Sequence, residues 1–402
     1  MILKGVQDVL IEEKYVWIIA NSIDWLLRYD ISQKKLELVA PYPEDVGTDH
    51  NPFSKIVKLE DEIYFIPQTA KDIFFYDLNK KVFCKLNVPI DHTRYAHNIQ
   101  TIVKGKVIYC IDRFPDFVIK IDTVSKKYKV FNFDDNLYIN KTAESKIYRS
   151  YKGLCLHNEK IIWSNYGNIL TVFDIEHEEF SVEVMDGLSQ EKVKRINKDL
   201  NIELKDWIIG VHSFKNMLWL FSFEGRIYQY NDKTHKIENR FFGDYNINTD
   251  NLEVSVFRDI VPLGDELWFI PQYKNKCVKY SSNTNQFETG MDSYIQTWEG
   301  YERDYTLCKA VNKQEILVFS YYENCFYHLD TKQNLVHKKK LKVPVGEFIK
   351  EPVFNHSMVD GNLYKFDDLD FLYKEISCRK EDKQLNCLNS VIGKNIYECL
   401  KT

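Results

Sequence analysis

Residues 62–89 read EIYFIPQTAKDIFFYDLNKKVFCKLNVP, and the same pattern returns at residues 266–288 as ELWFIPQYKNKCVKYSSNTNQFE. In the first copy, three short runs rich in Ile, Tyr and Phe are separated by polar breaks of a few residues. Such spacing is typical of consecutive antiparallel strands. Weaker copies follow one another along the whole chain, so the sequence predicts a repeat protein built from β-meanders.

A residue that follows the second apolar run marks each copy of the pattern. The marks lie 44 to 57 residues apart, at Asp30, Asp77, Asp122, Asp174, Asn231, Ser281, Asp330 and Lys374. Four-stranded units that repeat every ~40 to 50 residues are the signature of β-propeller blades. Blades packed face to face in a closed ring bury both faces of each meander. We therefore predict an all-β fold, a closed β-propeller of four-stranded antiparallel blades, with eight blades and with seven as the alternative.

The predicted propeller occupies residues 1–380 as a single domain. Its longest interruption, residues 186–206, carries apolar residues at helical spacing and is expected to hold a short amphipathic helix. Residues 381–402 have similar spacing and are expected to form a short helical tail packed on the propeller. The eighth unit, residues 354–377, has no evident fourth strand, so residues 1–4 or the segment near Cys378 would complete it. If the first and eighth units merge into one blade, the ring has seven.

Composition argues against several classes of partner. The 54 basic and 59 acidic residues give a net charge of −5 with mixed signs, so we expect neither nucleic acid nor membrane as a partner. Glu12, Glu13 and Lys14 interrupt the N-terminal apolar residues, so we expect neither a signal peptide nor a transmembrane span there. The nine cysteines lack CxxC spacing and are expected to be reduced, buried thiols of a cytoplasmic protein.

One segment carries a family resemblance. Residues 162–174, IWSNYGNILTVFD, place an aromatic run before an Asn turn and an Ile-to-Asp strand. This pattern resembles the repeats of YVTN-type and streptogramin-lyase-like bacterial propellers, and of the Kelch-like superfamily at large. The Trp-Asp ending of WD repeats, the Gly-Gly doublet of Kelch repeats and the Asp-box of sialidases are absent. The histidine pair and magnesium site of the lyases have no counterpart here residue by residue, so the resemblance implies a fold and no chemistry.

In a propeller, the connections into the innermost strands and the hairpins between second and third strands gather on one face around the central channel. This face is the usual binding site of the fold. Its arginines suit a carboxylate or phosphate ligand, and they are Arg94, Arg149, Arg258 and Arg303. Its aromatic residues suit stacking on a ligand, and they include Tyr95, Trp298 and Tyr305. The same position in the repeat adds His50, Tyr151, Trp207, Tyr301 and His356.

Two histidines on this face, His97 and His212, are candidates for a general base because imidazole titrates near neutral pH. Loop hydrogen bonds, salt bridges and blade packing are the alternative roles for all of these residues. The repeated Ile-Pro-Gln is expected to end the second strand at Pro67 and Pro271, and to direct Gln68 and Gln272 toward the channel mouth.

The sequence lacks HExxH, Gly-x-Ser-x-Gly, paired CxxC and a glycine-rich phosphate loop. We expect no metal and no cofactor. The function that these patterns favour is binding of a small polar or peptide-like ligand, or of a protein partner, on the channel face. The alternative is a lyase or isomerase that acts at the same mouth on a small anionic or peptide-like substrate, with His97 or His212 as its base.

Overall fold

The computed structural model describes residues 6–20, 23–33, 35–46, 52–88, 99–111, 117–133, 153–166, 169–185, 193–197, 200–204, 208–222, 225–242, 256–271, 276–292, 305–320, 325–333, 335–339, 357–359 and 362–364. These residues form an all-β protein whose only described helix is the short 3-10 helix η1 (Glu44–Val46). The fold is a β-propeller, and seven four-stranded antiparallel blades are present among the described residues.

The chain divides into two compact units, and the first contains two blades. Each of these blades is a meander in which neighbouring strands are consecutive in sequence. Blade one consists of β1 (Val6–Ile11), β2 (Tyr15–Ala20), β3 (Ile23–Asp30) and β4 (Lys35–Pro41). Blade two consists of β5 (Phe53–Leu59), β6 (Glu62–Pro67), β7 (Ile73–Asp77) and β8 (Val82–Leu86).

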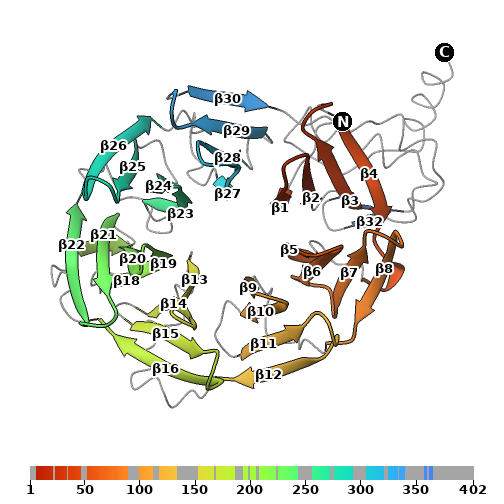
Figure 1. Cartoon of the computed structure of the whole chain (residues 1–402), viewed down its shortest axis with the longest axis horizontal. Helices are drawn as coiled ribbons and strands as arrows, with labels where there is room; N and C mark the ends of the chain where they lie inside the picture. Colours follow the sequence, from red (N-terminus) through yellow and green to blue (C-terminus); the bar gives the residue numbers. More distant parts are fainter. Residues whose placement is uncertain are drawn as a thin grey trace. The chain divides into compact units, whose positions relative to one another are not determined.

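The second unit contains five blades with the same meander topology. Blade three is β9 (Gln100–Lys104), β10 (Val107–Ile111), β11 (Phe117–Asp122) and β12 (Tyr128–Asn132). Blade four is β13 (Leu154–His157), β14 (Lys160–Tyr166), β15 (Ile169–Asp174) and β16 (Glu179–Val184). Blade five is β19 (Ile208–Phe214), β20 (Met217–Ser222), β21 (Arg226–Asn231) and β22 (Lys236–Phe242). Blade six is β23 (Phe257–Leu263), β24 (Glu266–Pro271), β25 (Lys276–Ser281) and β26 (Gln286–Asp292), and blade seven is β27 (Tyr305–Ala310), β28 (Glu315–Ser320), β29 (Cys325–Asp330) and β30 (Leu335–Lys339). Within this unit the first strand of each blade lies innermost and the fourth lies outermost (Figure 1).

The expectation of eight blades is wrong, and the alternative of seven is confirmed. Blade one draws all four of its strands from residues 6–41, so it needs no strand from the C-terminal part of the chain. The eighth unit of the sequence yields a two-stranded sheet of β31 (Ser357–Val359) and β32 (Asn362–Tyr364). Its apolar runs resemble in sequence the first hairpin of a blade, but the two strands that pair have only three residues each. The predicted tail, residues 381–402, lies outside the described residues, and the single domain stays a prediction.

The insertion between blades four and five is a β-hairpin where the sequence analysis expected a helix. β17 (Val193–Asn197) pairs in antiparallel register with β18 (Leu200–Leu204). The apolar residues that show helical spacing belong to two different strands. Within β18 alone, Leu200, Ile202 and Leu204 alternate with polar residues. Such period-two alternation is the strand pattern, and it decides the local structure here.

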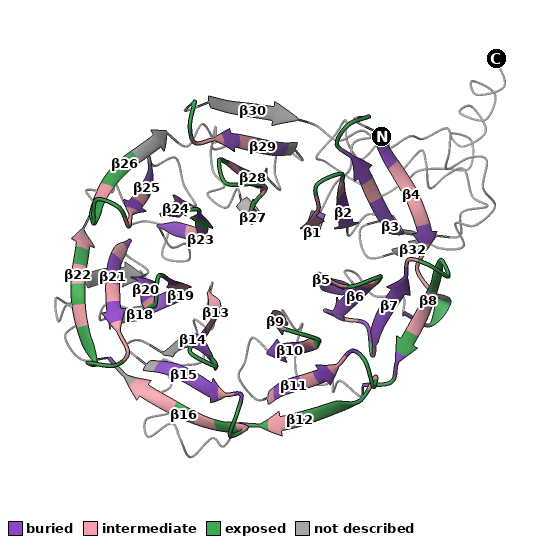
Figure 2. Ribbon diagram, viewed as in Figure 1, coloured by how far each residue is buried: buried purple, intermediate pink, exposed green. Residues whose placement is uncertain are grey.

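Apolar clusters fill the boundaries between neighbouring blades inside each unit. In the first unit, Trp17 and Ile19 of blade one pack with Phe53 and Phe65 of blade two. In the second unit, similar clusters join blades three and four, four and five, and five and six. Second strands such as β6 and β20 are mostly buried, whereas the outer strand β12 is largely exposed (Figure 2). Burial of one Phe or Leu side chain stabilises a fold by ~1.5–3 kcal/mol, so these boundaries hold the blades together.

The Asp or Asn that marks six of the seven blades closes the turn between the third and fourth strands. In blade two, Asp77 Oδ1 accepts backbone N–H bonds from Asn79 at 3.0 Å and Lys80 at 2.9 Å. The N–H of Lys80 is the largest influence that holds the pKa of the Asp77 carboxyl below its usual value. The same turn recurs at Asp30, Asp122, Asp174, Asn231 and Asp330. The recurring Asp or Asn therefore marks a turn that is held by hydrogen bonds between residues close in sequence.

Candidate functional site

Each blade has two different ends, which we call the loop end and the turn end. At the turn end, two to four residues join the first strand to the second, and in blade two these are Glu60 and Asp61. At the loop end, much longer segments join one blade to the next, and they span residues 42–52, 87–99, 133–153, 185–207, 243–256 and 293–304. Because binding residues concentrate on such loops over a rigid scaffold, the loop end is the first candidate for a site.

The inner strands are also irregular at the loop end. Five of the seven shift register near their first residues, at Val6/Asp8, Phe53/Lys55, Ile208/Gly210, Phe257/Asp259 and Tyr305/Leu307. A bulge sets two residues opposite one, bends the strand and changes the direction of a side chain. Bulges are common at rims and beside active sites, so this recurrence distinguishes the loop end from the regular turn end.

Arg258 is the candidate residue that the structure places most directly at this end. It lies within the bulge of β23, between Phe257, which is opposite Pro271, and Asp259, which is opposite Ile270. The Arg258 residue is half-buried. The position of this arginine at the start of an inner strand therefore agrees with the repeat register.

Blade two repeats this arrangement with Ser54 in place of the arginine. Phe53 is opposite Pro67, and the Ser54 hydroxyl lies 3.3 Å from the Pro67 carbonyl oxygen. The half-buried Gln68 follows, and its N–H donates to the Pro52 carbonyl at 2.8 Å. Pro67 ends the second strand of blade two as predicted, and Pro271 does the same in blade six.

The sequence analysis missed an acidic residue at the loop end of blade one. Asp24 is the second residue of β3, and burial raises the pKa of its carboxyl to about 6. Its charge, together with burial, raises the pKa of the enclosed Tyr42 hydroxyl, so the two groups are neighbours. The sequence signal was a single carboxylate inside the apolar run IDWLL. A carboxyl that titrates near neutral pH is suited to proton transfer.

His212 lies within the inner strand β19 instead of in a connecting loop. It pairs with Trp219, only two positions from the turn end of the strand. The residue is half-buried, and desolvation of the ring lowers its pKa to about 4. His212 is therefore a neutral imidazole at physiological pH.

Most of the other predicted site residues lie outside the described residues. These are Arg94, Tyr95, His97, Arg149, Trp298, Arg303 and Gln272, together with His50, Tyr151, Trp207, Tyr301 and His356 of the wider set. Tyr305 begins β27, and only its backbone is described. The convergence of these side chains on one ligand stays a prediction.

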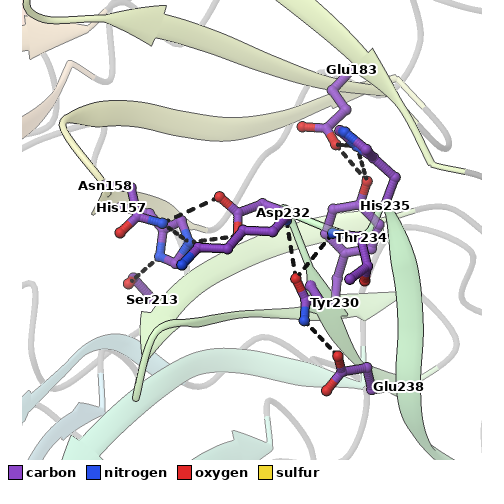
Figure 3. A network of polar contacts seen from close by, with 11 residues as sticks. His157, Asn158, Glu183, Ser213, Tyr230, Asp232, Thr234, His235 and Glu238 are labelled. Carbon is purple, nitrogen blue, oxygen red and sulfur yellow. Dashed lines mark hydrogen bonds and ion pairs between the residues drawn. The ribbon is translucent and has the colours of Figure 1, made fainter.

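A second polar cluster lies at the turn end, between blades four and five, and the sequence analysis missed it as well. His157 ends β13, Ser213 is in β19 and Asp232 follows β21 (Figure 3). His157 is buried with 3% of its surface exposed, and its Nδ1 lies 2.8 Å from Ser213 Oγ. At the corresponding strand ends, blades two and six carry Leu59 and Leu263. A histidine where other repeats carry leucine was the signal that could have revealed it.

The described residues contain neither a candidate metal site nor a candidate membrane-spanning helix. No group of three or more His, Cys, Asp or Glu residues among them is arranged to hold a metal ion. Within the same residues, no helix has both the length and the apolar character needed to traverse a lipid bilayer.

Comparison with known proteins supports the fold, but it identifies no family and no function. No protein-family model matches the chain, and no curated protein matches its sequence. The computationally designed Ika8 protein is similar in structure, with a TM-score of 0.52 and 10% identity over 90% of this chain and 97% of that one. The extracellular domain of BT4673 from B. thetaiotaomicron gives a TM-score of 0.49 and 13% identity, over 79% of this chain and 37% of that one. Hsv2 of Kluyveromyces lactis gives 0.47 and 10%, over 84% and 98% of the two chains. At such low identity the similarity to Ika8 concerns the fold alone.

Proposed function

We propose that the protein is a binding propeller that takes a small polar or peptide-like ligand, or a protein partner, at the loop ends of its blades. The observation that carries this proposal is the register shift near the start of five inner strands, with Arg258 inside one of them. The blades packed within each unit supply a rigid frame, and the long connections supply variable contacts.

The chemistry favours an anionic ligand. A guanidinium group presents a fixed fork of N–H donors that matches a carboxylate or phosphate. Arg258 supports this directly, and Arg94, Arg149 and Arg303 support it through their place in the repeat. Tyr95, Trp298 and Tyr305 would add stacking, while Gln68 and Gln272 would add amide contacts.

The test uses an alanine pair. Arg94→Ala with Arg303→Ala should abolish binding of an anionic probe while lowering the melting temperature only slightly, because the substituted groups contact the ligand instead of the core. Citrate, inorganic phosphate and a hexapeptide rich in Glu serve as probes in calorimetric titrations. Arg240→Ala is the matched control, since Arg240 is exposed on the outer strand β22. Unchanged affinity in the double variant for every probe that the unmodified protein binds would rule this site out.

A lyase or isomerase acting at the same mouth is the second candidate. The observation that favours it is Asp24, whose pKa of about 6 suits a group that exchanges protons at neutral pH. His97 remains its other candidate base, whereas His212 lies near the turn end of β19, away from this mouth. The arginines would hold the anionic substrate. NMR spectra of each bound probe in D2O separate the two functions. A binding protein returns the probe unchanged, whereas a lyase or isomerase exchanges a carbon-bound proton or yields new resonances.

A further inference from the structure

The turn-end cluster of blades four and five has the composition of a nucleophilic site. Its members come from three separate segments of the second unit, and they meet because blade four packs against blade five. His157 is fixed by the two-residue turn that follows it, where Asn158 and Glu159 have φ of 47° and 63°. The imidazole lies between Ser213 and Asp232 (Figure 3).

The distances define a chain of three groups. Ser213 Oγ lies 2.8 Å from His157 Nδ1, and Asp232 Oδ1 lies 3.3 Å from His157 Nε2. Asn158 Nδ2 donates to the other Asp232 oxygen at 3.2 Å and also lies 3.0 Å from His157 Nε2. Ser213 is half-buried, whereas His157 is enclosed, so the hydroxyl is the more accessible member of the chain.

The position of the imidazole proton decides whether Ser213 is activated. Asp232 Oδ1 is buried without a hydrogen bond of good geometry, and His157 Nε2 lies 3.3 Å from it. A buried carboxylate oxygen without a donor is costly, so we assign the imidazole proton to Nε2. The Asn158 amide then donates to Asp232 Oδ2 and cannot also donate to Nε2. Nδ1 is then an acceptor, and the Ser213 hydroxyl donates to it. Burial alone would raise the pKa of Asp232, but bonds from His157 and Asn158 outweigh burial and keep the carboxyl ionised at neutral pH.

We propose that Ser213 is an activated nucleophile for acyl transfer, with His157 as its general base and Asp232 as the residue that positions the base. The Ser213 proton moves to Nδ1 while Oγ bonds to the carbonyl carbon of an ester. Collapse of the tetrahedral intermediate breaks the bond to the alcohol, which leaves with that proton. Water then repeats both steps and releases the carboxylic acid, which restores Ser213. This activity lies at the opposite end of the blades from the proposed binding face and is independent of it.

The experiment treats the intact chain with a fluorophosphonate probe, in which Oγ displaces fluoride at phosphorus. Peptide mass spectrometry should locate the label on Ser213, and Ser213→Ala should abolish it. His157→Gln should slow labelling by about 100-fold, the usual contribution of a general base. Asp232→Asn should slow it by about 10-fold, since the imidazole loses its anionic partner. Ser282→Ala, at a half-buried serine at the turn end of blade six, is the matched control and should leave labelling unchanged.

A second variant covers the case in which His157→Gln fails to fold. In Ser213→Cys, the thiol beside Nδ1 should react with iodoacetamide at pH 6 about 10-fold faster than the half-buried Cys84 of the same molecule. Absence of label on Ser213, or labelling at an unchanged rate in His157→Gln, would overturn the proposal. So would a cysteine at position 213 that reacts no faster than Cys84.

Discussion

Two carboxylates of blade one affect stability in different ways. Asp8 is fully buried in β1, and its Oδ2 accepts the backbone N–H of Ile56 in β5 at 3.1 Å. Lys55 Nζ lies 3.8 Å from the other oxygen. Asp24 is half-buried, and desolvation of its carboxyl raises the pKa to about 6. One side chain therefore joins two blades, whereas the other carries a charge that burial disfavours.

Asp8→Ala should lower the free energy of unfolding by about 1–3 kcal/mol, because it leaves the buried N–H of Ile56 without its acceptor. Asp8→Asn keeps an oxygen at the same place and should cost less. Urea titrations followed by tryptophan fluorescence measure both variants. Equal losses in the two variants would contradict the assigned role of the hydrogen bond.

Asp24→Asn should make stability less dependent on pH. The folded pKa of about 6 lies above the ordinary value of 3.8, so the contribution to stability is full below pH 3.8 and is lost as pH rises through 6. The variant should therefore be more stable than the unmodified protein at pH 8 by about 1–3 kcal/mol, and the difference should vanish at pH 4. Thermal unfolding at both pH values tests this. Asp45→Asn, at an exposed residue of η1, is the control and should bring no such gain at pH 8.

At the scale of elements, inner strands of neighbouring blades approach closely. A Cβ at Gly153, the residue before β13, would lie 2.4 Å from the backbone nitrogen of Val211 in β19 and 2.5 Å from its carbonyl oxygen. Backbone atoms cannot move aside as a flexible side chain can. The glycine therefore sets the distance between blades four and five, on which the contact between His157 and Ser213 depends.

Gly153→Ala should lower the free energy of unfolding by about 1–3 kcal/mol or more through overpacking. Gly264→Asn is a suitable comparison, because Gly264 has φ of 61° with no atom within 4 Å of an added Cβ, and asparagine tolerates that conformation. Differential scanning calorimetry should show a clear loss for the first variant and little for the second. Similar melting temperatures would mean that the two inner strands can separate without cost.

Each element also shows how far its own sequence specifies it. The turns closed by Asp77 and its equivalents form from hydrogen bonds over two and three residues, so the repeat pattern located them correctly. The insertion was assigned wrongly because spacing of three and four residues was read across the break between β17 and β18. A short apolar run is compatible with both the helical and the strand periodicity, and only its backbone hydrogen bonds in the fold show which one it adopts.

At the scale of the whole molecule, burial falls from the middle strands to the outermost strand of a blade. All five residues of β7 are buried, whereas four of the five residues of β12 are exposed. Slow amide exchange follows buried, doubly paired strands. Exchange measured by mass spectrometry should therefore be slowest in the second and third strands of both units, and fastest in β12 and β22 of the second unit. Uniform protection within blades would contradict this gradient.

The sequence by itself determined the β-propeller class, the blade boundaries and the buried cysteines. Alternating apolar runs and Asx turns act over a few residues, so they can be read directly. Cys110, Cys155, Cys277 and Cys308 are buried free thiols, as expected from their place in apolar strands.

Only the tertiary structure decided the number of complete blades and the neighbours of each polar side chain. His157 and Asp232 are 75 residues apart, and their contact depends on how one blade packs against the next. The bulge at Arg258 and the burial of Asp24 likewise depend on strands that pair or pack around them. The physical reason is the separation in sequence over which each effect acts. Turn and strand preferences depend on residues that are close together in the chain. Desolvation of a side chain, and its contacts with distant residues, depend on surfaces that form only on folding.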